Sequence, residues 1–399
     1  MELNGHKIII VGAGIGGLAA ALCLHARGAD VTVLEQAETI TEVGAGLQIT
    51  PNGVAVLRAL NLENALAATS VRAQAVVLRE HGSGDEVLRL DLARLAADQP
   101  YYFVHRADLI DLLALAVRQA GVQVRLLQKV DRVVQASGPD GDAQVFLADG
   151  AVLHADLVVG ADGLHSRARV ALNHGGAPFF TGQVAWRAVV PNSLTQAAQV
   201  TDAAEAQVFM GPGRHLVCYP LRRGNMINLV AVTERAAWAE EGWHHTDDPA
   251  NLRAAFAGFG GQAGALLDQV DELRVWGLFR HPVAACWHKG GVVLLGDAAH
   301  PTLPFMAQGA NMALEDAWVL ADSLARHGMG EAGLAAYQAR RRDRVVRVVE
   351  AANGNAWKYH LRPGPVRAAA HMALRLGGAL APGRMVHQFD WLYGHDVTA

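Results

Sequence analysis

Short apolar, β-branched runs alternate with amphipathic stretches along the first third of the chain. An apolar run at 7–11 leads into a glycine-rich turn at 12–17, a helical stretch at 18–27 and a second apolar run at 30–35. A strand, a helix and a strand in this order form a βαβ unit, whose strands are parallel and whose crossover is right-handed. A further amphipathic helix is predicted at 107–120, and further strands at 122–127, 145–147 and 155–159. The pattern predicts an α/β fold with a Rossmann-like domain.

The pattern changes between 182 and 276, where short strands separated by polar turns replace the strand–helix rhythm. The predicted strands are 184–190, 206–210, 215–220 and 226–233. A four-residue polar turn at 222–225 indicates antiparallel pairing of the last two. The strand–helix rhythm returns at 291, and the chain beyond 340 reads as helical. We therefore predict an antiparallel sheet domain inserted into a nucleotide-binding domain, followed by a helical C-terminus.

These changes of pattern give domain boundaries. The discontinuous nucleotide-binding domain is predicted to comprise 1–72, 99–181 and 277–345, the sheet domain 73–98 and 182–276, and the C-terminal helical segment 346–399. Within that last segment, 366–380 is amphipathic. We expect it to pack within the protein or to form a contact in a homodimer, and a helix lying on a membrane surface is the alternative.

Composition excludes several classes of protein. Lys and Arg number 34 against 38 Asp and Glu, so no basic excess is present to bind nucleic acid. Hydrophobic residues make up 51% and charged residues 18%, which suits a large buried core. The three cysteines are spaced neither for zinc nor for a disulfide framework, so no metal site is predicted. Without a secretory signal or an apolar run of about 18 residues, a cytoplasmic protein with no membrane span is expected.

The turn after the first strand carries Gly12, Gly14 and Gly17. Glycines at this spacing allow a tight turn, let the backbone approach a pyrophosphate, and let the following helix pack on the strand. The phosphates would then lie at the positive N-terminus of that helix. Glu35 stands at the end of the second strand, where a carboxylate accepts from ribose hydroxyls. A dinucleotide is predicted, and FAD and NAD both fit.

A second stretch separates these two cofactors. An apolar strand runs into Gly296 and Asp297, a proline-rich loop follows, and small residues open a helix at 309–311. The Asp297 carboxylate is placed to accept from the hydroxyls of a ribityl chain, although an aspartate here can also serve only as a helix N-cap. The amides of Gly309, Ala310 and Asn311 would face the flavin pyrimidine edge, where a helix N-terminus stabilises the negative charge of reduced flavin. FAD is therefore favoured.

Two further residues are candidates for the cofactor site, each with a structural alternative. Asp162 follows a strand and precedes a Ser-Arg-x-Arg helix start at 166–169 that could contact phosphates, although an aspartate before glycine often marks only a turn. Arg106 precedes a helix, where it could bind the diphosphate or pair with Asp108.

The inserted sheet offers a candidate reaction site. His215 and Tyr219 alternate along one strand and therefore share a face, so they could form a proton relay or fill a core. Imidazole is the side chain best matched to phenol deprotonation near neutral pH. Met210, Trp186 and Phe305 are candidates for an apolar pocket wall, or for core positions.

Together these motifs resemble the class A FAD-dependent aromatic hydroxylases, and the resemblance covers nearly the whole chain. It is nearest to the branch with salicylate hydroxylase, 3-hydroxybenzoate 6-hydroxylase and 6-hydroxynicotinate 3-monooxygenase. The matching residues are the turn at 12–17, Glu35, the small-residue triplet 44–46, Arg106, Asp162 and Gly163, the stretches 296–301 and 306–310, and the closing run 389–394.

The resemblance implies a monooxygenase that hydroxylates a small phenolic or hydroxy-heteroaromatic acid. NADH or NADPH would reduce FAD, O2 would add at flavin C4a, and the hydroperoxide would transfer a hydroxyl group to the ring. His215 would act as base or relay, and Tyr219 would orient the substrate hydroxyl. No second glycine turn is evident, so the nicotinamide is expected to bind only transiently.

The resemblance leaves the substrate open. Relatives in this branch carry other residues at Gln48, Pro304 and Phe305, all of which are expected in the substrate pocket. A decarboxylating hydroxylase or an epoxidase on the same fold, a plain NAD-dependent dehydrogenase, and a flavin-binding sensor without hydroxylase activity remain as alternatives.

Overall fold

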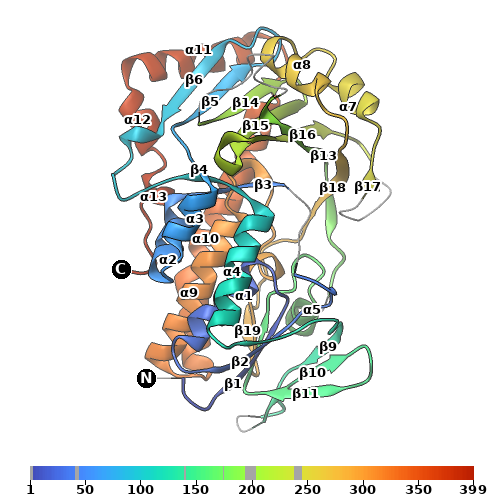
Figure 1. The fold of residues 1–399 in the computed structure, drawn as a ribbon, viewed down its shortest axis with the longest axis vertical. Coiled ribbons are helices and arrows are strands. Elements are labelled where there is room, and N and C mark those ends of the chain that lie inside the picture. The colour runs from blue at the N-terminus through green and yellow to red at the C-terminus, as the bar shows by residue number, and fades with distance from the viewer. Residues whose placement is uncertain (1–2, 41–44, 139–140, 174, 194–203, 238–244) are drawn as a thin grey trace.

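The computed structural model describes residues 3–40, 45–138, 141–173, 175–193, 204–237 and 245–399. Gly44 of the 44–46 triplet therefore lies outside the described residues. Two large sheets dominate the fold, and Figure 1 shows strands of the first, β1 and β2, in the lower half and strands of the second, β13 to β16, in the upper half. The predicted α/β class, with an inserted sheet and a helical C-terminus, is confirmed.

The first sheet has the order β19-β20-β12-β1-β2-β8, and all neighbours are parallel except the edge pair β19 and β20. Its strands are β1 (Lys7–Val11), β2 (Asp30–Leu34), β8 (Gln123–Arg125), β12 (Leu157–Gly160), β19 (His288–Lys289) and β20 (Val292–Leu294). Helix α1 (Ile15–His25) is apolar on nearly every side, because it packs against β1 and β2 as well as α4 (Arg106–Gln119) and α9 (Gly309–His327). A three-stranded antiparallel sheet and a short helix complete this unit: β9 (Val130–Val134), β10 (Ala143–Leu147), β11 (Val152–Ala155) and α5 (Arg167–Asn173).

The second sheet has eight strands in the order β17-β18-β13-β16-β15-β14-β5-β6. They are β5 (Ala75–Glu80), β6 (Glu86–Asp91), β13 (Phe179–Pro191), β14 (Glu205–Gly211), β15 (Arg214–Leu221), β16 (Met226–Glu234), β17 (His245–Thr246) and β18 (Arg274–Arg280). Two strands from 73–98 thus join the strands of 182–276 in one sheet. The pair β14 and β5 is parallel, unlike the expected antiparallel pattern, because the two strands come from separate chain segments and no hairpin joins them. The exact domain boundaries stay a prediction.

A small sheet and two helices lie between these units. The sheet has the order β3-β7-β4, and the elements are β3 (Gly46–Ile49), β4 (Val71–Arg72), β7 (Tyr102–His105), α2 (Pro51–Ala59) and α3 (Glu63–Thr69). The outer face of the eight-stranded sheet is covered by α7 (Pro249–Ala255) and α8 (Gly261–Asp268). Single-turn 3-10 helices occur at η1 (Leu92–Arg94), η2 (Arg222–Gly224), η3 (Gly296–Ala298) and η4 (Pro304–Met306).

Helix α10 (Glu331–Tyr359) connects the two large sheets. Its 29 residues span about 43 Å at the usual rise of an α-helix. Near its start, Tyr337 donates a hydrogen bond to the Leu294 carbonyl of β20 (3.0 Å). At its end, Tyr359 contacts His215 of β15, with ring centroids 5.3 Å apart. The two sheets are therefore held by one rigid element.

The chain ends in α11 (Pro365–Leu380), α12 (Pro382–His387) and α13 (Asp390–Tyr393). Helix α11 packs on β6, with His371 buried and Leu374 in the adjoining cluster, and it exposes Met372, Leu376 and Leu380. The homodimer contact and the membrane-surface alternative for this helix stay predictions. No helix among the described residues is long and apolar enough to cross a membrane.

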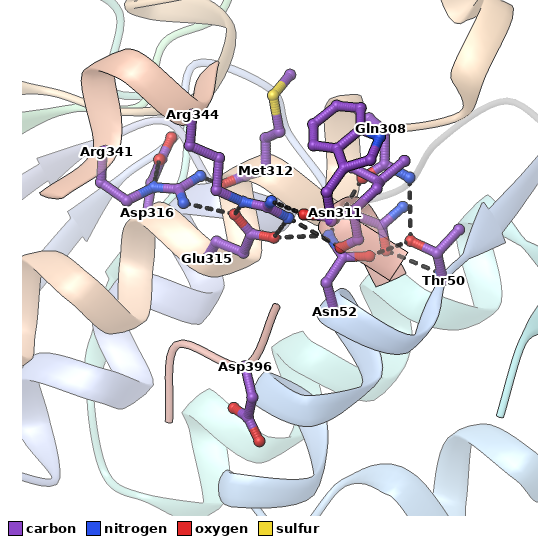
Figure 2. Close-up of polar contacts among 12 residues, drawn as sticks. Thr50, Asn52, Gln308, Asn311, Met312, Glu315, Asp316, Arg341, Arg344 and Asp396 are labelled. Atoms are coloured by element: carbon purple, nitrogen blue, oxygen red, sulfur yellow. Dashed lines mark hydrogen bonds and ion pairs between the residues drawn. The ribbon is translucent and has the colours of Figure 1, made fainter. Parts of the chain in front are cut away.

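A buried group of charges joins α9 to α10 (Figure 2). Glu315 and Asp316 on α9 and Arg341 on α10 are fully buried, and Arg344 lies at their edge. Arg341 Nη1 lies 2.5 Å from Glu315 Oε2 and its Nε 2.7 Å from Asp316 Oδ1, while Arg344 Nη2 lies 2.7 Å from Glu315 Oε1. Two carboxylates and two guanidiniums cancel in charge, which is the condition under which burial of ions is tolerated.

The same group fixes the loop after β20. Asp316 Oδ2 accepts a hydrogen bond from the Gly296 amide (2.9 Å) and lies 2.6 Å from His300 Nε2. Burial alone would raise the pKa of Asp316, but the charges of His300 and Arg341 and their hydrogen bonds hold it at about 2. The carboxylate is therefore ionised at neutral pH and holds η3 in place through hydrogen bonds of the stronger, charge-assisted kind.

Replacing Arg341 with Met should lower the free energy of unfolding by about 3–5 kcal/mol, because two buried carboxylates lose a shared cation. Denaturant unfolding of the purified protein measures this. Arg326→Met is the matched control, since Arg326 on the same helix α9 is mostly exposed and its partner Asp322 keeps a second cation, Arg340. That loss should be less than about 1 kcal/mol. Equal losses in the two variants would contradict the expectation.

Candidate active site

A cavity of about 400 Å³ lies between the two large sheets. One part is lined by the glycine turn and the starts of helices: Gly14, Ile15, Gly16, Arg106, Gly163, His165, Asp297, Gly309 and Ala310. The other part is lined by the inner face of the eight-stranded sheet and the elements facing it: Gln48, Tyr101, Arg187, His215, Tyr219, Trp276, Pro304, Phe305, Tyr359 and Tyr393. Candidate residues from both predicted sites thus meet in one space.

Each of the three glycines in the turn is needed for a different physical reason. Gly12 has φ +103°, and a Cβ on it would lie 2.5 Å from the Ala161 carbonyl oxygen. A Cβ on Gly17 would lie 2.0 Å from the Gly12 carbonyl oxygen, so only glycine lets α1 pack this closely. Gly14 instead lines the cavity, and a Cβ there would meet nothing within 4 Å. Its open space is where a diphosphate could approach the backbone.

Glu35 follows β2 and braces the glycine turn. Its Oε2 accepts from the Ala13 amide and its Oε1 from the Ala37 amide, both at 2.9 Å. Each carboxylate oxygen keeps a second lone pair, which can accept from a ribose hydroxyl. The position at the end of the second parallel strand is the one predicted from the sequence.

Arg106 and Asp297 both line the cavity, and they act on each other electrostatically. Burial raises the pKa of Asp297, while the positive charges of His300 and Arg106 offset part of that rise. The Asp297 side chain is exposed along the cavity that it lines. Asp108, the alternative partner considered for Arg106, forms a bidentate ion pair with Arg222 at 2.7 and 3.1 Å.

Asp162 serves the start of α5 rather than lining the cavity. Its carboxylate accepts from the amide of Arg167 (2.6 Å) and from the Ser166 hydroxyl (2.5 Å). These bonds are the structural alternative considered for this residue, and they shape the Gly163–His165 loop that does line the cavity. Arg169 of the same helix donates to the carbonyls of Ala298 and Ala299 at 3.0 and 3.1 Å, so α5 also supports η3.

Asn311 is fully buried and positions the start of α9. Its Nδ2 donates to the carbonyls of Gln48 (3.0 Å) and Ala307 (2.7 Å), and its Oδ1 accepts from the Thr50 amide (3.0 Å). A Cβ on Gly53 would lie 2.1 Å from that Oδ1, so a glycine is needed where α2 passes. Asn311 therefore holds the cavity-lining amides of Gly309 and Ala310 while pointing its own side chain elsewhere.

His215 and Tyr219 both line the cavity, but they do not contact each other. Four residues of strand separate their Cα atoms by roughly 13 Å. Tyr219 is hydrogen-bonded to Gln48, whose Oε1 accepts from Tyr101 at 2.5 Å. His215 has a different partner, since its Nδ1 lies 2.7 Å from Nε2 of His360. The direct His–Tyr relay considered from the sequence is therefore not formed.

Within the 44–46 triplet, Gly46 is needed for the space that its missing side chain leaves. A Cβ on Gly46 would lie 2.6 Å from Tyr219 Cε2 and 2.7 Å from the Asn228 Cγ. The Gly46 amide also donates to Asn228 Oδ1 at 2.7 Å. Tyr219 can thus lie against the backbone of β3 only because residue 46 has no side chain.

Two residues expected at the pocket wall have other places. Trp186 points to the face of β13 that is turned away from the cavity. There it packs in a cluster with residues of α7 and α8, and its Nε1 donates a hydrogen bond to Asp247 at 2.7 Å. Met210 pairs with His215 across β14 and β15 but packs with Leu78 and Leu88, outside the cavity lining. Phe305 and Pro304 do line the cavity, and the Phe305 ring meets His215 edge-on, with centroids 5.2 Å apart.

Sequence patterns missed several lining residues. Arg187 lies on β13 in a row with Val230 and Val217, midway between the rows of His215 and Tyr219. Its guanidinium lies 4.4 Å from the centroid of the Trp276 ring. An arginine inside an apolar strand was the available signal, since Arg187 is the one charged residue within 182–190.

Comparisons with known proteins agree with this arrangement. The model of the family described as "FAD binding domain" matches residues 6–352. The chain belongs to this FAD-binding family. It is 36% identical to 3-amino-4-hydroxybenzoate 2-monooxygenase of Streptomyces cremeus, over 90% of this chain and 89% of that protein. It is 33% identical to 3-hydroxybenzoate 6-hydroxylase 1 of Aquipseudomonas alcaligenes, over 98% of both chains.

A solved salicylate hydroxylase substrate complex has the same fold, with a TM-score of 0.81 at 23% identity over 98% of this chain and 96% of that one. The predicted membership of the FAD-dependent aromatic hydroxylases is confirmed. The plain NAD-dependent dehydrogenase is excluded by the same findings.

The residues at the cavity fit FAD. Gly14 leaves an open cradle at the start of α1, Arg106 supplies a cation, and Asp297 an acceptor for hydroxyls. The α9 N-terminus, with Gly309 and Ala310 lining the cavity, adds positive potential for an electron-rich ring. Among the described residues no cluster of His, Cys, Asp or Glu is arranged to hold a metal ion.

Gly14→Ala tests this cradle. Because a Cβ at Gly14 meets no protein atom, the apoprotein should unfold at the wild-type denaturant midpoint. The methyl group would occupy the space of the diphosphate, so the affinity for FAD should fall at least about tenfold. The FAD content per chain, read from flavin absorbance, should fall with it. Gly258→Ala, an equally open glycine remote from the cavity, should bind FAD as the wild type does. Wild-type flavin content in Gly14→Ala would contradict this assignment.

Proposed function

We propose that this protein hydroxylates a small phenolic or hydroxy-heteroaromatic carboxylic acid, using FAD, O2 and NADH or NADPH. The observation that carries the proposal is the single cavity joining the residues that fit FAD to a sheet face with a buried imidazole, a tyrosine and an arginine. A cavity that excludes water would suit a reactive oxygen species that water would otherwise destroy. The transient use of a nicotinamide and the three free cysteines are consistent with a cytoplasmic setting.

When bound, FAD supplies an electrophilic oxygen atom derived from O2. The chain's own task is to make the substrate ring electron-rich. His215 lines the cavity, and an imidazole that takes the proton of a bound hydroxyl group raises the electron density of the ring. Phe305 and Tyr359 contact the His215 ring on its other sides, which fixes its direction.

The other end of the sheet face suits the carboxylate. Gln48 Oε1 accepts from Tyr101, so the Gln48 amide nitrogen is what faces Tyr219. The Tyr219 hydroxyl then keeps its proton to donate into the cavity. Arg187 lies beside it, since its charge acts on the Tyr219 pKa, which burial otherwise raises strongly. A hydroxybenzoate bridging His215 and this pair would present its hydroxyl to the base; Tyr219 would then orient the acid through its carboxylate rather than through the hydroxyl.

The function is tested with FAD-loaded protein and a set of amino-hydroxybenzoates, hydroxybenzoates and hydroxynicotinates. One or more acids should stimulate NADH or NADPH oxidation above the rate measured without an acid. Mass spectrometry should find the acid plus one oxygen. Loss of CO2 would favour the decarboxylating alternative. If no acid stimulates oxidation and no product forms, the proposal fails and a flavin-binding protein without hydroxylase activity is favoured.

Arg187→Met tests the carboxylate assignment. Loss of a hydrogen-bonded charge pair should raise KM for the acid about 10- to 100-fold, with a smaller effect on kcat, and should leave turnover of the matching carboxamide unchanged. Arg132→Met is the matched control, since Arg132 also stacks on an aromatic ring, Phe146 at 4.0 Å, but outside the cavity. Equal changes for acid and carboxamide would contradict the assignment.

A further inference from the structure

A chain of three titratable side chains leads from the cavity to the surface. His215 Nδ1 lies 2.7 Å from His360 Nε2, and His360 Nδ1 lies 2.9 Å from Glu234 Oε1. Both imidazoles are buried, whereas the Glu234 side chain is 52% exposed. The three residues come from β15, from the residue after α10, and from β16, so the path depends on the tertiary fold. None of the sequence patterns pointed to His360 or Glu234.

The carboxylate sets the proton positions along this chain. An ionised Glu234 only accepts, so the proton of His360 must lie on Nδ1. Neutral His360 then has a bare Nε2, which accepts from Nδ1–H of His215. His215 therefore has a bare Nε2, the ring nitrogen left for the cavity, and a bare nitrogen is what a base needs.

We propose that His360 and Glu234 form a proton path that lets His215 accept the substrate's hydroxyl proton and pass one on to solvent. Both are positioning residues, because they act through His215 and do not touch the substrate. The proposal rests on the proposed hydroxylase function. It identifies how the base His215 is oriented and how it passes on the proton that it accepts.

The transfer balances in protons and involves no redox change. The substrate O–H bond breaks as Nε2–H forms on His215, while Nδ1–H of His215 passes to Nε2 of His360. Nδ1–H of His360 passes in turn to Glu234 Oε1, which exchanges with water. When the hydroxylated ring regains aromaticity its oxygen needs a proton again, and the same path returns one and restores both tautomers.

Burial explains why a path is needed. Burial holds the pKa of His215 well below its usual range, and a positive charge on His360 would lower it further, so an imidazolium at His215 is strongly disfavoured. A coupled transfer leaves His215 neutral at every stage. His360 is faced by Glu234 from β16 and by His215 and Arg214 from β15; burial lowers its pKa, Glu234 raises it and Arg214 lowers it further.

Glu234→Gln in the FAD-loaded enzyme is the central test, using the acid that the wild type turns over best. Gln keeps the acceptor but cannot take a proton, so kcat near pH 6.5 should fall about 10- to 100-fold with KM unchanged. The deficit should shrink as pH rises toward the ionisation of the free phenol near about 10, and Glu234→Asp should restore part of the rate. Glu331→Gln is the matched control, because Glu331 also faces a histidine, His288 at 3.4 Å, away from the cavity.

A second readout needs no turnover. Nitrogen-15 NMR of histidine-labelled holoenzyme, with His215→Gln and His360→Gln for assignment, should show both rings protonated at Nδ1 and bare at Nε2. The reverse tautomer in either ring would overturn the proposal. So would a deficit in Glu234→Gln that is independent of pH or no larger than that of Glu331→Gln, while the wild type still hydroxylates. Absence of hydroxylation by the wild type itself would instead overturn the proposed function.

Discussion

The packing of α9 against α10 through buried, mutually cancelling charges is the constraint on which the rest of the site depends. Glu315 and Asp316 cannot be left without Arg341, because an unpaired buried carboxylate costs several kcal/mol. The geometry of the two helices is therefore fixed more tightly than apolar contacts alone would fix it. Asp316 accepts a hydrogen bond from the Gly296 amide, and Glu315 accepts one from Asn52 at 2.6 Å. The loop after β20 and the start of α2 are therefore both held in place by these two carboxylates.

The ion pairs between α9 and α10 also affect the face of the eight-stranded sheet. That face lies about 27 Å away, the length of α10 from Arg341 to Tyr359. Because α10 is continuous over this distance, the ion pairs that hold Asp297 at the cavity also set where Tyr359 and His360 meet His215. The residues that fit the cofactor and those that we propose to carry a proton are thus placed by one element. A two-domain enzyme whose parts merely touched would not couple them in this way.

The sequence predicted what is local and periodic, and missed what depends on which face of an element is buried. The glycine turn, the parallel strands and the alternation of His215 and Tyr219 follow from short-range rules, and the structure has them. For Trp186 the sequence left a pocket wall and a core position open, and the structure has the core position. One face of β13 packs on α7 and α8 and the other faces the cavity, so the pattern of burial alone could not choose between Trp186 and Arg187 as the lining residue. The buried role of Glu315 was not predicted, because its partners on α10 lie 26 and 29 residues away in the sequence.

The exclusion of water from a cavity also determines how the titratable side chains around that cavity can behave. A space that protects a reactive oxygen species from water must be poor in water, and in such a space an imidazole resists taking a positive charge. His215 is 2% exposed and meets that condition fully. An exposed histidine could give its proton to solvent directly, and would need neither His360 nor Glu234. Burial of the base on β15 and the proposed exit for its proton, through His360 after α10 and Glu234 on β16, are therefore two aspects of a single requirement.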